Sequence, residues 1–498
     1  MAATESPVAL VDTELRKTKA FVGGDWIDAD SGSTFAVVDP ASGEMLGEVP
    51  RMGAAETRRA IGAAERAYPG WRALLAKDRA RILRRFADLV VEHREDLAVL
   101  MVLEQGKPLG EARGEIDYAA SFLEWFGEEA KRVYGDTIPE PLAGRRILVL
   151  KQPVGVSAGI TPWNFPAAMV TRKAAPALAA GCTMVLKPAE QTPLSALALC
   201  ELAKRAGVPH GVLNVVTGDA ADAPTIGREL TSNPAVRKLG FTGSTAVGKL
   251  LMEQCAHQVK KVSLELGGNA PFIVFDDADL DGAAEAMRLC KFRNSGQTCI
   301  SANRILVQKR VFDEYASRLA DLASALKVAP GLEDGAQVGP LIDDQGFDKV
   351  ERHVEDAIEN GAELVVGGAR HPLGGRFFTP TVLTQVSPAM SMSCEETFGP
   401  VAGLIPFDSE EEAVRIANDT PYGLCAYYFT GDLSRAWRVG EALEAGIVAL
   451  NTGFISTEVA PFGGVKESGI GREGSKYGIE EWLELKYLAM GGIEGTAR

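Results

Sequence analysis

VRKLGFTGSTAVGK, at residues 236–249, is the segment that most clearly indicates the fold class. It begins as a short apolar run typical of a buried strand, turns at small polar residues, and continues with a helical pattern. Three strand-like runs precede it, with helical patterns between them: VGVSAGI (154–160), TMVLKP (183–188) and GVLNVVTG (211–218). Apolar strands that alternate with helices indicate a parallel sheet covered on both faces, which binds ligands at the carboxyl ends of its strands. The chain is therefore predicted to be α/β.

A second α/β series is predicted from residue 261 onward. KVSLEL (261–266) and PFIVF (271–275) have strand patterns, and LDGAAEAMRLCKF (280–292) has a helical one. Residues 51–135 are predicted to be helical. Near the carboxyl end, EEWLELKYLAM (480–490) resembles a strand without a partner close in sequence. We expect residues 141–152, or another subunit, to pair with it.

Composition bounds the class of protein. The 498 residues suggest two to four domains, with 46% hydrophobic and 24% charged residues. A net charge of −15, without a basic stripe, argues against nucleic acid as a partner, and an anionic substrate would need local cations. The amino end MAATESPVALVDTELRKT lacks the pattern of a secretory signal, and no apolar run is long enough to span a bilayer. Seven scattered cysteines and five histidines show neither a disulfide framework nor metal-ligand spacing, so we expect no metal and a cytoplasmic location.

The turn after the strand at 236–242 has two competing interpretations. Gly243 to Lys249 fits the phosphate loop GxxxxGK, and FIVFDD (272–277) resembles the acidic strand of a phosphate-loop NTPase. However, Leu250 stands where that loop needs a magnesium-binding hydroxyl. The dinucleotide fingerprint GxGxxG is also incomplete, because its middle glycine is missing. A pyrophosphate at this helix start, or a capping turn without a ligand, remain the alternatives to an NTPase.

A second turn, KFRNSGQTCI (291–300), contains Cys299. A cysteine in a packed strand or helix is usually a small hydrophobic residue. The flanking small polar residues predict instead a flexible backbone, nearby amide hydrogens and access to solvent, which are the conditions for a thiolate to form and attack.

Seven strings occur in one order and resemble the NAD(P)-dependent aldehyde dehydrogenase family from about residue 20 to residue 490: PWNFP (162–166), LKPAEQTP (186–193), FTGSTAVG (241–248), LELGGNAP (264–271), GQTC (296–299), EETFGPV (395–401) and PFGGVKESG (461–469). Within the family, the chain is most similar to the succinate-semialdehyde dehydrogenases. The resemblance implies a Rossmann-type cofactor domain (1–131 and 153–260), an α/β catalytic domain (261–470) and a small β oligomerisation flap (132–152 and 471–498). In relatives the flap strands pair across subunits, so a homodimer or homotetramer is expected.

The same resemblance implies three catalytic residues. Cys299 is the expected nucleophile, because a free carbonyl has no hydride to give until it becomes tetrahedral. Asn164 and the backbone N–H of Cys299 are the expected donors to the oxyanion. Glu265 is the expected base that activates water against the thioester, and we predict that its position at an apolar strand end raises its pKa.

Cofactor contacts follow from the resemblance in the same way. Glu190 is expected to bind both hydroxyls of the adenosine ribose and to repel a 2′-phosphate, and relatives that prefer NADP often have a small residue there. NAD is therefore predicted as the preferred cofactor, with NADP used poorly. The full set of expected cofactor contacts is Trp163, Lys187, Glu190, Gly243, Ser244, Gly248, Leu266, Glu396 and Phe398.

The expected substrate is a small aldehyde with a carboxylate. Arg172 and Arg293 match the arginines that hold this carboxylate in succinate-semialdehyde dehydrogenases, and Ser456 matches the accompanying hydroxyl. Arginine suits the task because its planar fork binds a carboxylate through two parallel hydrogen bonds. Nearby, Thr452 and Phe454 replace the commoner Glu and Leu. Glutarate semialdehyde, or another small aldehyde, therefore stays open as the alternative to succinate semialdehyde.

Overall fold

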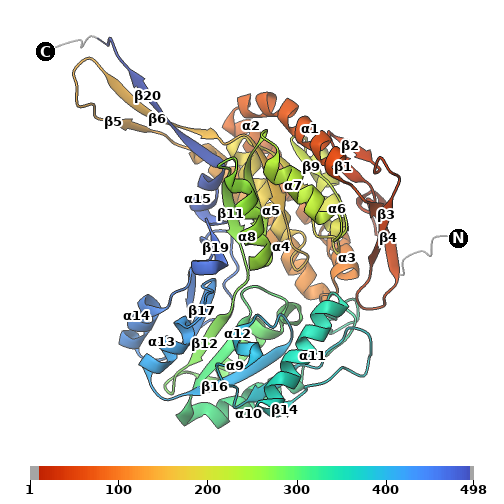
Figure 1. The fold of residues 1–498 in the computed structure, drawn as a ribbon, viewed down its shortest axis with the longest axis vertical. Helices are drawn as coiled ribbons and strands as arrows, with labels where there is room; N and C mark the ends of the chain where they lie inside the picture. Colours follow the sequence, from red (N-terminus) through yellow and green to blue (C-terminus); the bar gives the residue numbers. More distant parts are fainter. Residues whose placement is uncertain (1–9, 494–498) are drawn as a thin grey trace.

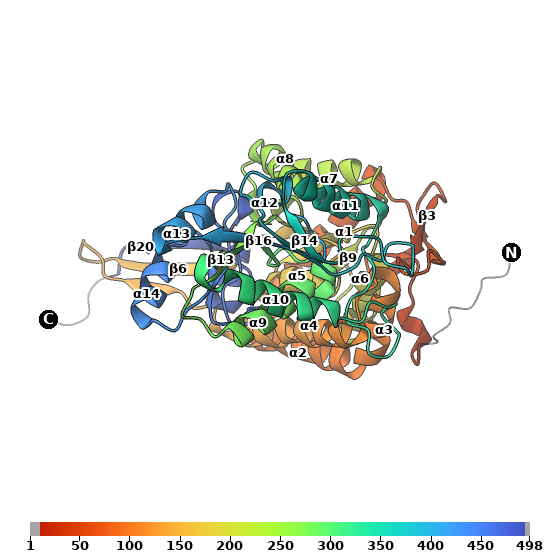
Figure 2. The same ribbon diagram turned by 90° about the horizontal axis from the view of Figure 1, so that it is seen from below.

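The computed structural model describes residues 10–493, so the outermost ends of the expected cofactor domain (1–9) and flap (494–498) lie outside the described residues. Figure 1 shows two bodies, each built around a sheet, and a narrow β arm that projects away from them. Figure 2 shows the same bodies from below, with the arm and the start of the described chain at opposite ends.

The first body contains an eight-stranded sheet. Its five central strands are parallel, as predicted, and its edge strands β19, β1 and β2 are antiparallel to their neighbours. In sheet order the strands are β19 (Gly469–Ile470), β11 (Lys261–Glu265), β10 (Val236–Thr242), β7 (Val156–Ile160), β8 (Thr183–Lys187), β9 (Leu213–Val215), β1 (Ala20–Val22) and β2 (Asp25–Ile27).

Helices cover both faces of this sheet because its strands are apolar on both sides. In β8, Val185 packs into one core, whereas its neighbours Met184 and Leu186 pack into the other. One face carries α1 (Ala54–Ala73), α7 (Ala223–Ser232) and α8 (Thr245–Ala256). The other carries α2 (Ala76–Glu92), α3 (Arg94–Gln105), α4 (Leu109–Glu129), α5 (Ala168–Ala180) and α6 (Pro193–Arg205).

The second body is a seven-stranded sheet with helices on both faces. In sheet order its strands are β14 (Glu363–Val366), β15 (Thr381–Thr384), β16 (Val401–Phe407), β13 (Ala302–Gln308), β12 (Ala270–Val274), β17 (Cys425–Phe429) and β18 (Ile447–Leu450). One face is covered by α9 (Leu280–Phe292) and α10 (Phe312–Ser324). The other is covered by α11 (Asp344–Glu359), α13 (Glu410–Asn418) and α14 (Leu433–Ala442), with the short α12 (Ser391–Cys394) nearby.

One strand lies in a different sheet from the one predicted. Residues 261–265 were expected to open the second series, but they form β11 of the first sheet, where Leu239 pairs with Val262 and Phe241 with Leu264. The reason is that α8 is a crossover helix that returns the chain to the sheet it left, beside β10. The second series therefore begins with β12.

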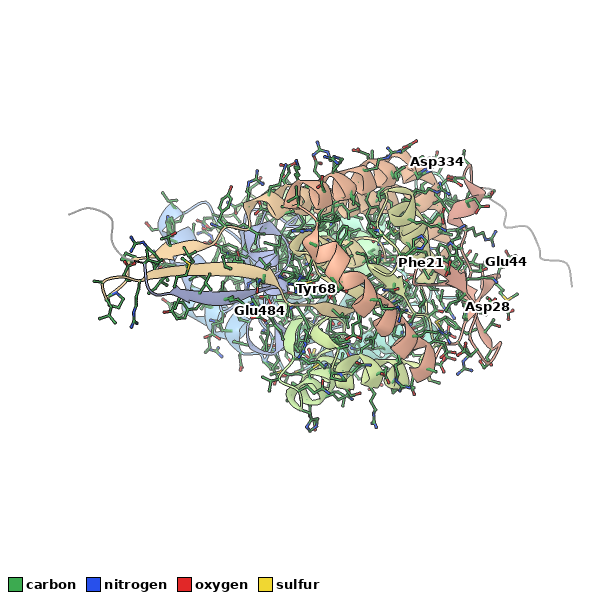
Figure 3. All side chains as sticks on the ribbon, turned by 90° about the horizontal axis from the view of Figure 1, so that it is seen from above. Phe21, Asp28, Glu44, Tyr68, Asp334 and Glu484 are labelled. Carbon is green, nitrogen blue, oxygen red and sulfur yellow. The ribbon has the colours of Figure 1, made fainter. Side chains whose placement is uncertain are left out.

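The arm is a three-stranded antiparallel sheet of β5 (Asp136–Ile138), β6 (Arg146–Pro153) and β20 (Leu483–Met490). The predicted pairing of the carboxyl-terminal strand with the segment around 141–152 is confirmed, with Leu483 opposite Pro153. Figure 3 shows Tyr68 at the base of the arm and Glu484 on it. The Tyr68 hydroxyl donates a hydrogen bond of 3.2 Å to the carbonyl of Pro153. The remaining small elements are the β3 (Thr34–Val38) and β4 (Met45–Pro50) pair and α15 (Ser475–Gly478).

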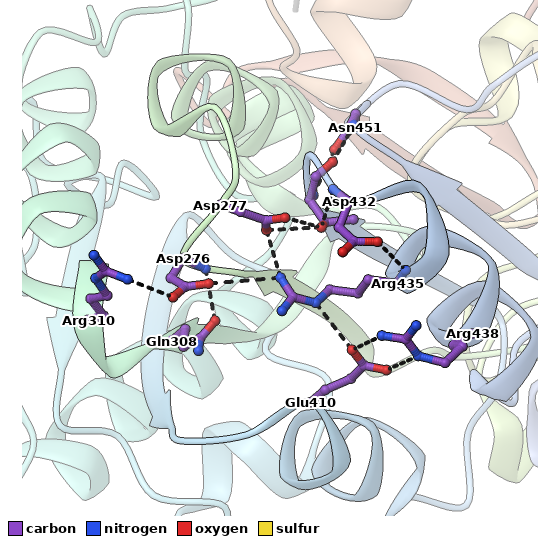
Figure 4. A network of polar contacts seen from close by, with 10 residues as sticks. Asp276, Asp277, Gln308, Arg310, Glu410, Asp432, Arg435, Arg438 and Asn451 are labelled. Atoms are coloured by element: carbon purple, nitrogen blue, oxygen red, sulfur yellow. Dashed lines mark hydrogen bonds and ion pairs between the residues drawn. The ribbon is translucent and has the colours of Figure 1, made fainter.

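Charged contacts close the carboxyl ends of the second sheet (Figure 4). Arg435 contacts Asp277 at 2.8 Å and Glu410 at 3.2 Å, and its guanidinium lies 4.5 Å from the centroid of the Phe275 ring. Glu410 also binds Arg438 at 2.9 Å. The network occupies the edge at which open α/β sheets usually bind ligands. In residues 10–493, no helix is long and apolar enough to cross a membrane.

Candidate active site

The three predicted catalytic residues and the expected cofactor contact Glu396 lie close to strand ends of the two sheets. In the first sheet, Asn164 follows β7 and Glu265 ends β11, so both lie at carboxyl ends. In the second sheet, Cys299 precedes β13 and Glu396 precedes β16, so both lie at amino ends. Open α/β sheets usually bind ligands at the carboxyl ends of their strands, and the first sheet follows this rule. In the second sheet, the Arg435 network occupies those ends.

The turn that carries Cys299 is tightly constrained. Asn294 and Ser295 have left-handed φ values of 52° and 56°, which cost backbone energy in residues other than glycine. Gly296 follows with φ 75°, and a side chain there would come within 2.1 Å of the carbonyl of Gly399. The sequence suggested a flexible turn, but the surrounding residues hold it in one conformation.

The Cys299 thiol is partly exposed, but its environment favours the protonated form. Burial and the nearby carboxylate of Glu396 raise its pKa to about 12, while the charge of Arg172 acts in the opposite direction. The expectation of a ready thiolate was wrong for the free protein. Sequence shows polar neighbours in the turn, but not the carboxylates brought there from other strands.

Asn164 contacts the nucleophile turn directly. Its side-chain amide donates a 3.1 Å hydrogen bond to the carbonyl of Gln297, two residues before Cys299. The side chain is buried, with 6% of the residue exposed. An amide donor is thus held beside the turn that carries the thiol, as an oxyanion site requires.

Glu265 is an unpartnered buried carboxyl group. The residue is 4% exposed and neither of its oxygens has a hydrogen-bond partner. Burial and the charge of Glu473 raise its pKa well above the usual range, which confirms the predicted direction. Gly463 leaves room for it, because a side chain there would lie 2.9 Å from Oε1 of Glu265.

Glu473 belongs to the site but was not singled out in the sequence. Its carboxylate contacts Lys173 at 2.6 Å and Arg172 at 3.0 Å, although the contact with Arg172 lacks hydrogen-bond geometry. Burial opposes the ionisation of Glu473, but these two cations prevail and lower its pKa. Lys173 also donates a 2.5 Å hydrogen bond to Thr242. The last of the seven strings that resemble the family ends at residue 469, so none of them includes Glu473.

The two expected carboxylate-binding arginines have different surroundings. Arg172 is 2% exposed, is ion-paired with Glu473, and lies 4.1 Å from the centroid of the Phe462 ring, with its Nη2 unpartnered. Arg293 has no ion-pair partner within residues 10–493, its Nε is buried without a hydrogen bond, and it lies over Phe165 and Phe454 at 5.6 and 5.2 Å. Glu473 therefore neutralises part of the charge of Arg172, whereas no described carboxylate pairs with Arg293.

Two hydroxyls complete the description of this region. Ser456 lies half-buried in the loop after β18. Tyr118, on α4, has a buried hydroxyl without a partner, and its ring packs edge-on against Phe122 at 4.8 Å. Sequence analysis missed Tyr118 because an aromatic residue on a helix looks like part of the core.

The turn before α8 is built for close approach. Ser244 caps the helix by accepting a 3.4 Å hydrogen bond from the amide of Val247. A side chain on Gly243 would come within 2.5 Å of the Phe241 ring, and one on Gly248 within 2.4 Å of Leu266. A pyrophosphate fits this capped helix start with its free amide groups. Lys249, the lysine of the NTPase interpretation, is instead ion-paired with Glu467 at 2.8 Å.

The other expected cofactor contacts lie at or after the ends of β7 and β8 and before β16. Lys187, at the end of β8, contacts the partly exposed Glu190 at 3.4 Å. Trp163 and Phe398 pack edge to face at 5.6 Å. Glu396 accepts a 3.4 Å hydrogen bond from the amide of Gly268, and burial raises its pKa to about 7. Two carboxylates that can accept hydrogen bonds from ribose hydroxyls are therefore present, Glu190 after β8 and Glu396 before β16. Among residues 10–493, no group of three or more His, Cys, Asp and Glu side chains is arranged to hold a metal ion.

Comparisons with known proteins agree with this geometry. The model of the family described as "Aldehyde dehydrogenase family" matches residues 26–488. The chain is 62% identical over 482 residues to succinate-semialdehyde dehydrogenase (NADP+) GabD of Escherichia coli, covering 97% of this chain and 99% of the relative. It is 60% identical over 484 residues to glutarate-semialdehyde dehydrogenase of Pseudomonas aeruginosa, covering 97% and 100%. The solved structure of succinate-semialdehyde dehydrogenase from Burkholderia pseudomallei has a TM-score of 0.96 at 60% identity, covering 97% of this chain and 100% of that one.

Proposed function

The chain belongs to the aldehyde dehydrogenase family, and from this premise we propose that it oxidises succinate semialdehyde to succinate with NAD or NADP. The observation that supports a carboxylated substrate is Arg293, a cation without an ion-pair partner among the described residues, in a protein of net charge −15. Arg172 would assist through its unpartnered Nη2, and Ser456 through its hydroxyl. A guanidinium between aromatic rings is weakly hydrated, so it exchanges little water for a substrate carboxylate.

We propose that Cys299 attacks the aldehyde carbon to form a thiohemiacetal. Because the resting thiol is protonated, its proton must leave as the carbon–sulfur bond forms, and Glu265 would accept it, since it combines a raised pKa with unpartnered oxygens and its charge acts on the thiol. The oxygen of the former carbonyl then carries negative charge, which the amide of Asn164 and the backbone N–H of Cys299 would stabilise.

Release of the acid requires water and a base. A bound nicotinamide dinucleotide supplies the acceptor for the hydride that leaves the thiohemiacetal, and Cys299 is then held as a thioester. Glu265 would take a proton from the water that attacks this thioester. The negative charge of Glu473 helps to keep the pKa of Glu265 high, so Glu265 is a stronger base than an exposed glutamate.

The cofactor is proposed to bind at the start of α8. Gly243, Ser244 and Gly248 would hold the pyrophosphate, with Leu266 packed beneath Gly248. Lys187 and Glu190 would bind the adenosine ribose. At the other end, Trp163, Glu396 and Phe398 would hold the nicotinamide ribose and ring.

We propose NAD as the preferred cofactor, because the carboxylate of Glu190 would repel a 2′-phosphate. The E. coli relative carries NADP+ in its name. The proposed preference for NAD therefore rests on Glu190 of this chain, and activity must be measured with both cofactors. Lys187 lies 3.4 Å from Glu190 and offsets part of that repulsion. The preference for NAD is accordingly expected to be moderate rather than absolute.

The alternative substrate is glutarate semialdehyde, which is one methylene longer. The P. aeruginosa relative is named for this activity. Phe454, which is 57% exposed and lies over Arg293, is the residue most able to change the room available to the chain. One methylene is worth only about 1 kcal/mol, so the two substrates are expected to compete.

We also propose a homodimer or homotetramer, assembled through the arm. Leu485 and Tyr487 on β20 and Leu142 before β6 are more than half exposed, which is costly for an isolated arm. Residues 132–152 and 471–498 would form this flap. The cofactor part, 1–131 and 153–260, would also include β11, and the catalytic part would extend from there to 470. All seven cysteines are unpaired, which fits a reducing cytoplasm.

The test is NADH and NADPH formation by the wild type and by Cys299→Ala with succinate semialdehyde, glutarate semialdehyde and propanal. We expect a strong preference for a carboxylated aldehyde and no activity in the variant. Best activity on propanal would remove the carboxylate-binding role, and an active variant would remove the thioester mechanism.

A further inference from the structure

A buried ion pair lies against the backbone of Asn164, outside the residues discussed so far. Lys107 follows α3 and is 2% exposed, and Glu115 lies on α4 and is 3% exposed. The Lys107 ammonium contacts a Glu115 carboxylate oxygen at 2.5 Å and donates a 2.8 Å hydrogen bond to the carbonyl of Asn164. It also lies 4.1 Å from the centroid of the Phe165 ring.

Glu115 holds the other side of the same segment. Its second oxygen accepts hydrogen bonds from the amides of Ala167 and Ala168, at 3.0 and 3.2 Å, where α5 begins. The segment from Asn164 to Ala168 is therefore held at its carbonyl by a cation and at the following helix start by an anion. The charges strengthen both contacts, because hydrogen bonds to ionised groups are about twice as strong as neutral ones.

Asn294 connects this segment to the nucleophile turn. Its side-chain amide donates to the carbonyls of Asn164 and Gln297, at 3.1 and 3.2 Å. Its own oxygen accepts a 2.9 Å hydrogen bond from Gln105, and its backbone amide donates to Glu111 at 2.7 Å. Asn294 also has the left-handed φ of 52°, so the strained turn is fixed by the same contacts.

We propose that Lys107, Glu115 and Asn294 are positioning residues that fix the amide of Asn164 relative to Cys299. This inference rests on the oxyanion role proposed above for Asn164. A buried ion pair is rarely more stabilising than apolar residues of the same volume, so stability alone does not account for one at this place. Orientation does, because the pair and Asn294 converge on one carbonyl of the residue whose side chain must meet the developing charge.

The single variants are Lys107→Met and Glu115→Gln, which keep side-chain length or shape and remove the charge. A displacement of about 1 Å in a catalytic group costs about 100-fold, so we expect kcat to fall about 100-fold. The KM for the aldehyde and the dissociation constant of NAD, measured by titration of protein fluorescence, should change little. Alkylation of Cys299 by iodoacetamide should keep its rate, because it needs no oxyanion donor.

Glu104→Gln is the matched control. Glu104 is also a fully buried carboxylate at a helix start, where it accepts hydrogen bonds from the amides of Leu194 and Ser195 at 2.7 and 2.8 Å. It does not contact Asn164 or the nucleophile turn. Burial raises the pKa of Glu104 to about 8, so the variant replaces a largely neutral carboxyl group; it should lower the melting temperature while kcat stays near the wild-type value.

The double variant Lys107→Met/Glu115→Leu separates positioning from folding, because it leaves no unpaired buried charge. We expect it to recover melting temperature relative to Lys107→Met while kcat stays about 100-fold low. If kcat recovers together with stability, or if Glu104→Gln loses as much kcat as Glu115→Gln, the pair is structural and the inference is wrong.

Asn164→Ala distinguishes the two levels of the proposal. If Asn164→Ala is inactive while Lys107→Met retains full kcat, the positioning inference fails and the oxyanion role stands. If Asn164→Ala itself retains full kcat, the oxyanion role fails and the inference falls with it.

Discussion

Replacing Arg293 by Met should convert a dehydrogenase selective for carboxylated aldehydes into a less selective one. Arg293 has no ion-pair partner in the described part of the chain, and its Nε is buried without a hydrogen bond. A substrate carboxylate would therefore receive its charge-assisted hydrogen bonds largely from this residue. Methionine keeps an unbranched apolar side chain beside Phe165 and Phe454 and removes the guanidinium that lies over their rings.

The magnitude follows from the loss of a charged partner. Hydrogen bonds to charged groups contribute about 1.5–3 kcal/mol, and removal of one member of a desolvated pair costs about 2–5 kcal/mol. Arg172 keeps its unpartnered Nη2 and limits the loss to the lower part of this range, about 3 kcal/mol, or about 100-fold in kcat/KM. Butanal has the same carbon count without the carboxylate, so its kcat/KM should be unchanged or higher.

The assay is the ratio of kcat/KM for succinate semialdehyde to that for butanal. Arg310→Met is the control, since it removes one positive charge from a residue whose side chain is 82% exposed and tests long-range attraction of the anion. We expect the ratio to fall about 100-fold in Arg293→Met and to stay constant in Arg310→Met. An equal fall for both aldehydes, or equal effects of the two variants, would refute the assignment.

Three further variants test other parts of the site. Because the Cys299 pKa is raised to about 12, its alkylation by iodoacetamide should rise about tenfold per pH unit from about pH 7 to 9 without a plateau. Glu396→Gln removes the carboxylate that raises this pKa, so alkylation should be faster near pH 9 and little changed below the Glu396 pKa of about 7; no acceleration near pH 9 would contradict the cause given. Gly248→Ala places a methyl group 2.4 Å from Leu266 and should weaken NAD binding and cost about 1–3 kcal/mol of folding stability, whereas Gly114→Ala, which meets nothing within 4 Å, should not destabilise; equal melting temperatures would argue against close packing at α8. Glu190→Ser should raise the NADP-to-NAD ratio of kcat/KM tenfold or more, since like charges about 4 Å apart near a surface repel by about 1–4 kcal/mol; an unchanged ratio would show that Glu190 does not select the cofactor.

Local patterns in the sequence predicted four of the five central strands of the first sheet and the strand at the carboxyl end. Short apolar runs such as 183–188 and 236–243 carry a period and length that specify a buried parallel strand. They do not say which sheet a strand joins. This is why β11 was placed in the second series, although α8 returns the chain to the first sheet, where β11 pairs with β10.

In the candidate site, the sequence identified residues whose chemistry is local and missed those that act through distant contacts. The raised pKa of Glu265 was predictable from an apolar strand end. The raised pKa of Cys299 was not, because Glu396 is 97 positions away in the chain. Glu473 and Lys107 escaped for the same reason, since each has its role through a partner that only the fold brings near.

The most direct measurement is a rapid-quench experiment on Glu265→Gln with succinate semialdehyde and NAD, followed by mass spectrometry of the Cys299 peptide. If Cys299 forms the thioester and Glu265 activates the water that hydrolyses it, the variant should release one NADH per active subunit in a burst, slower than in the wild type because Glu265 no longer accepts the thiol proton, and then stop. The Cys299 peptide should then carry a succinyl group. Steady turnover without a burst, or a burst with an unmodified Cys299, would contradict the account.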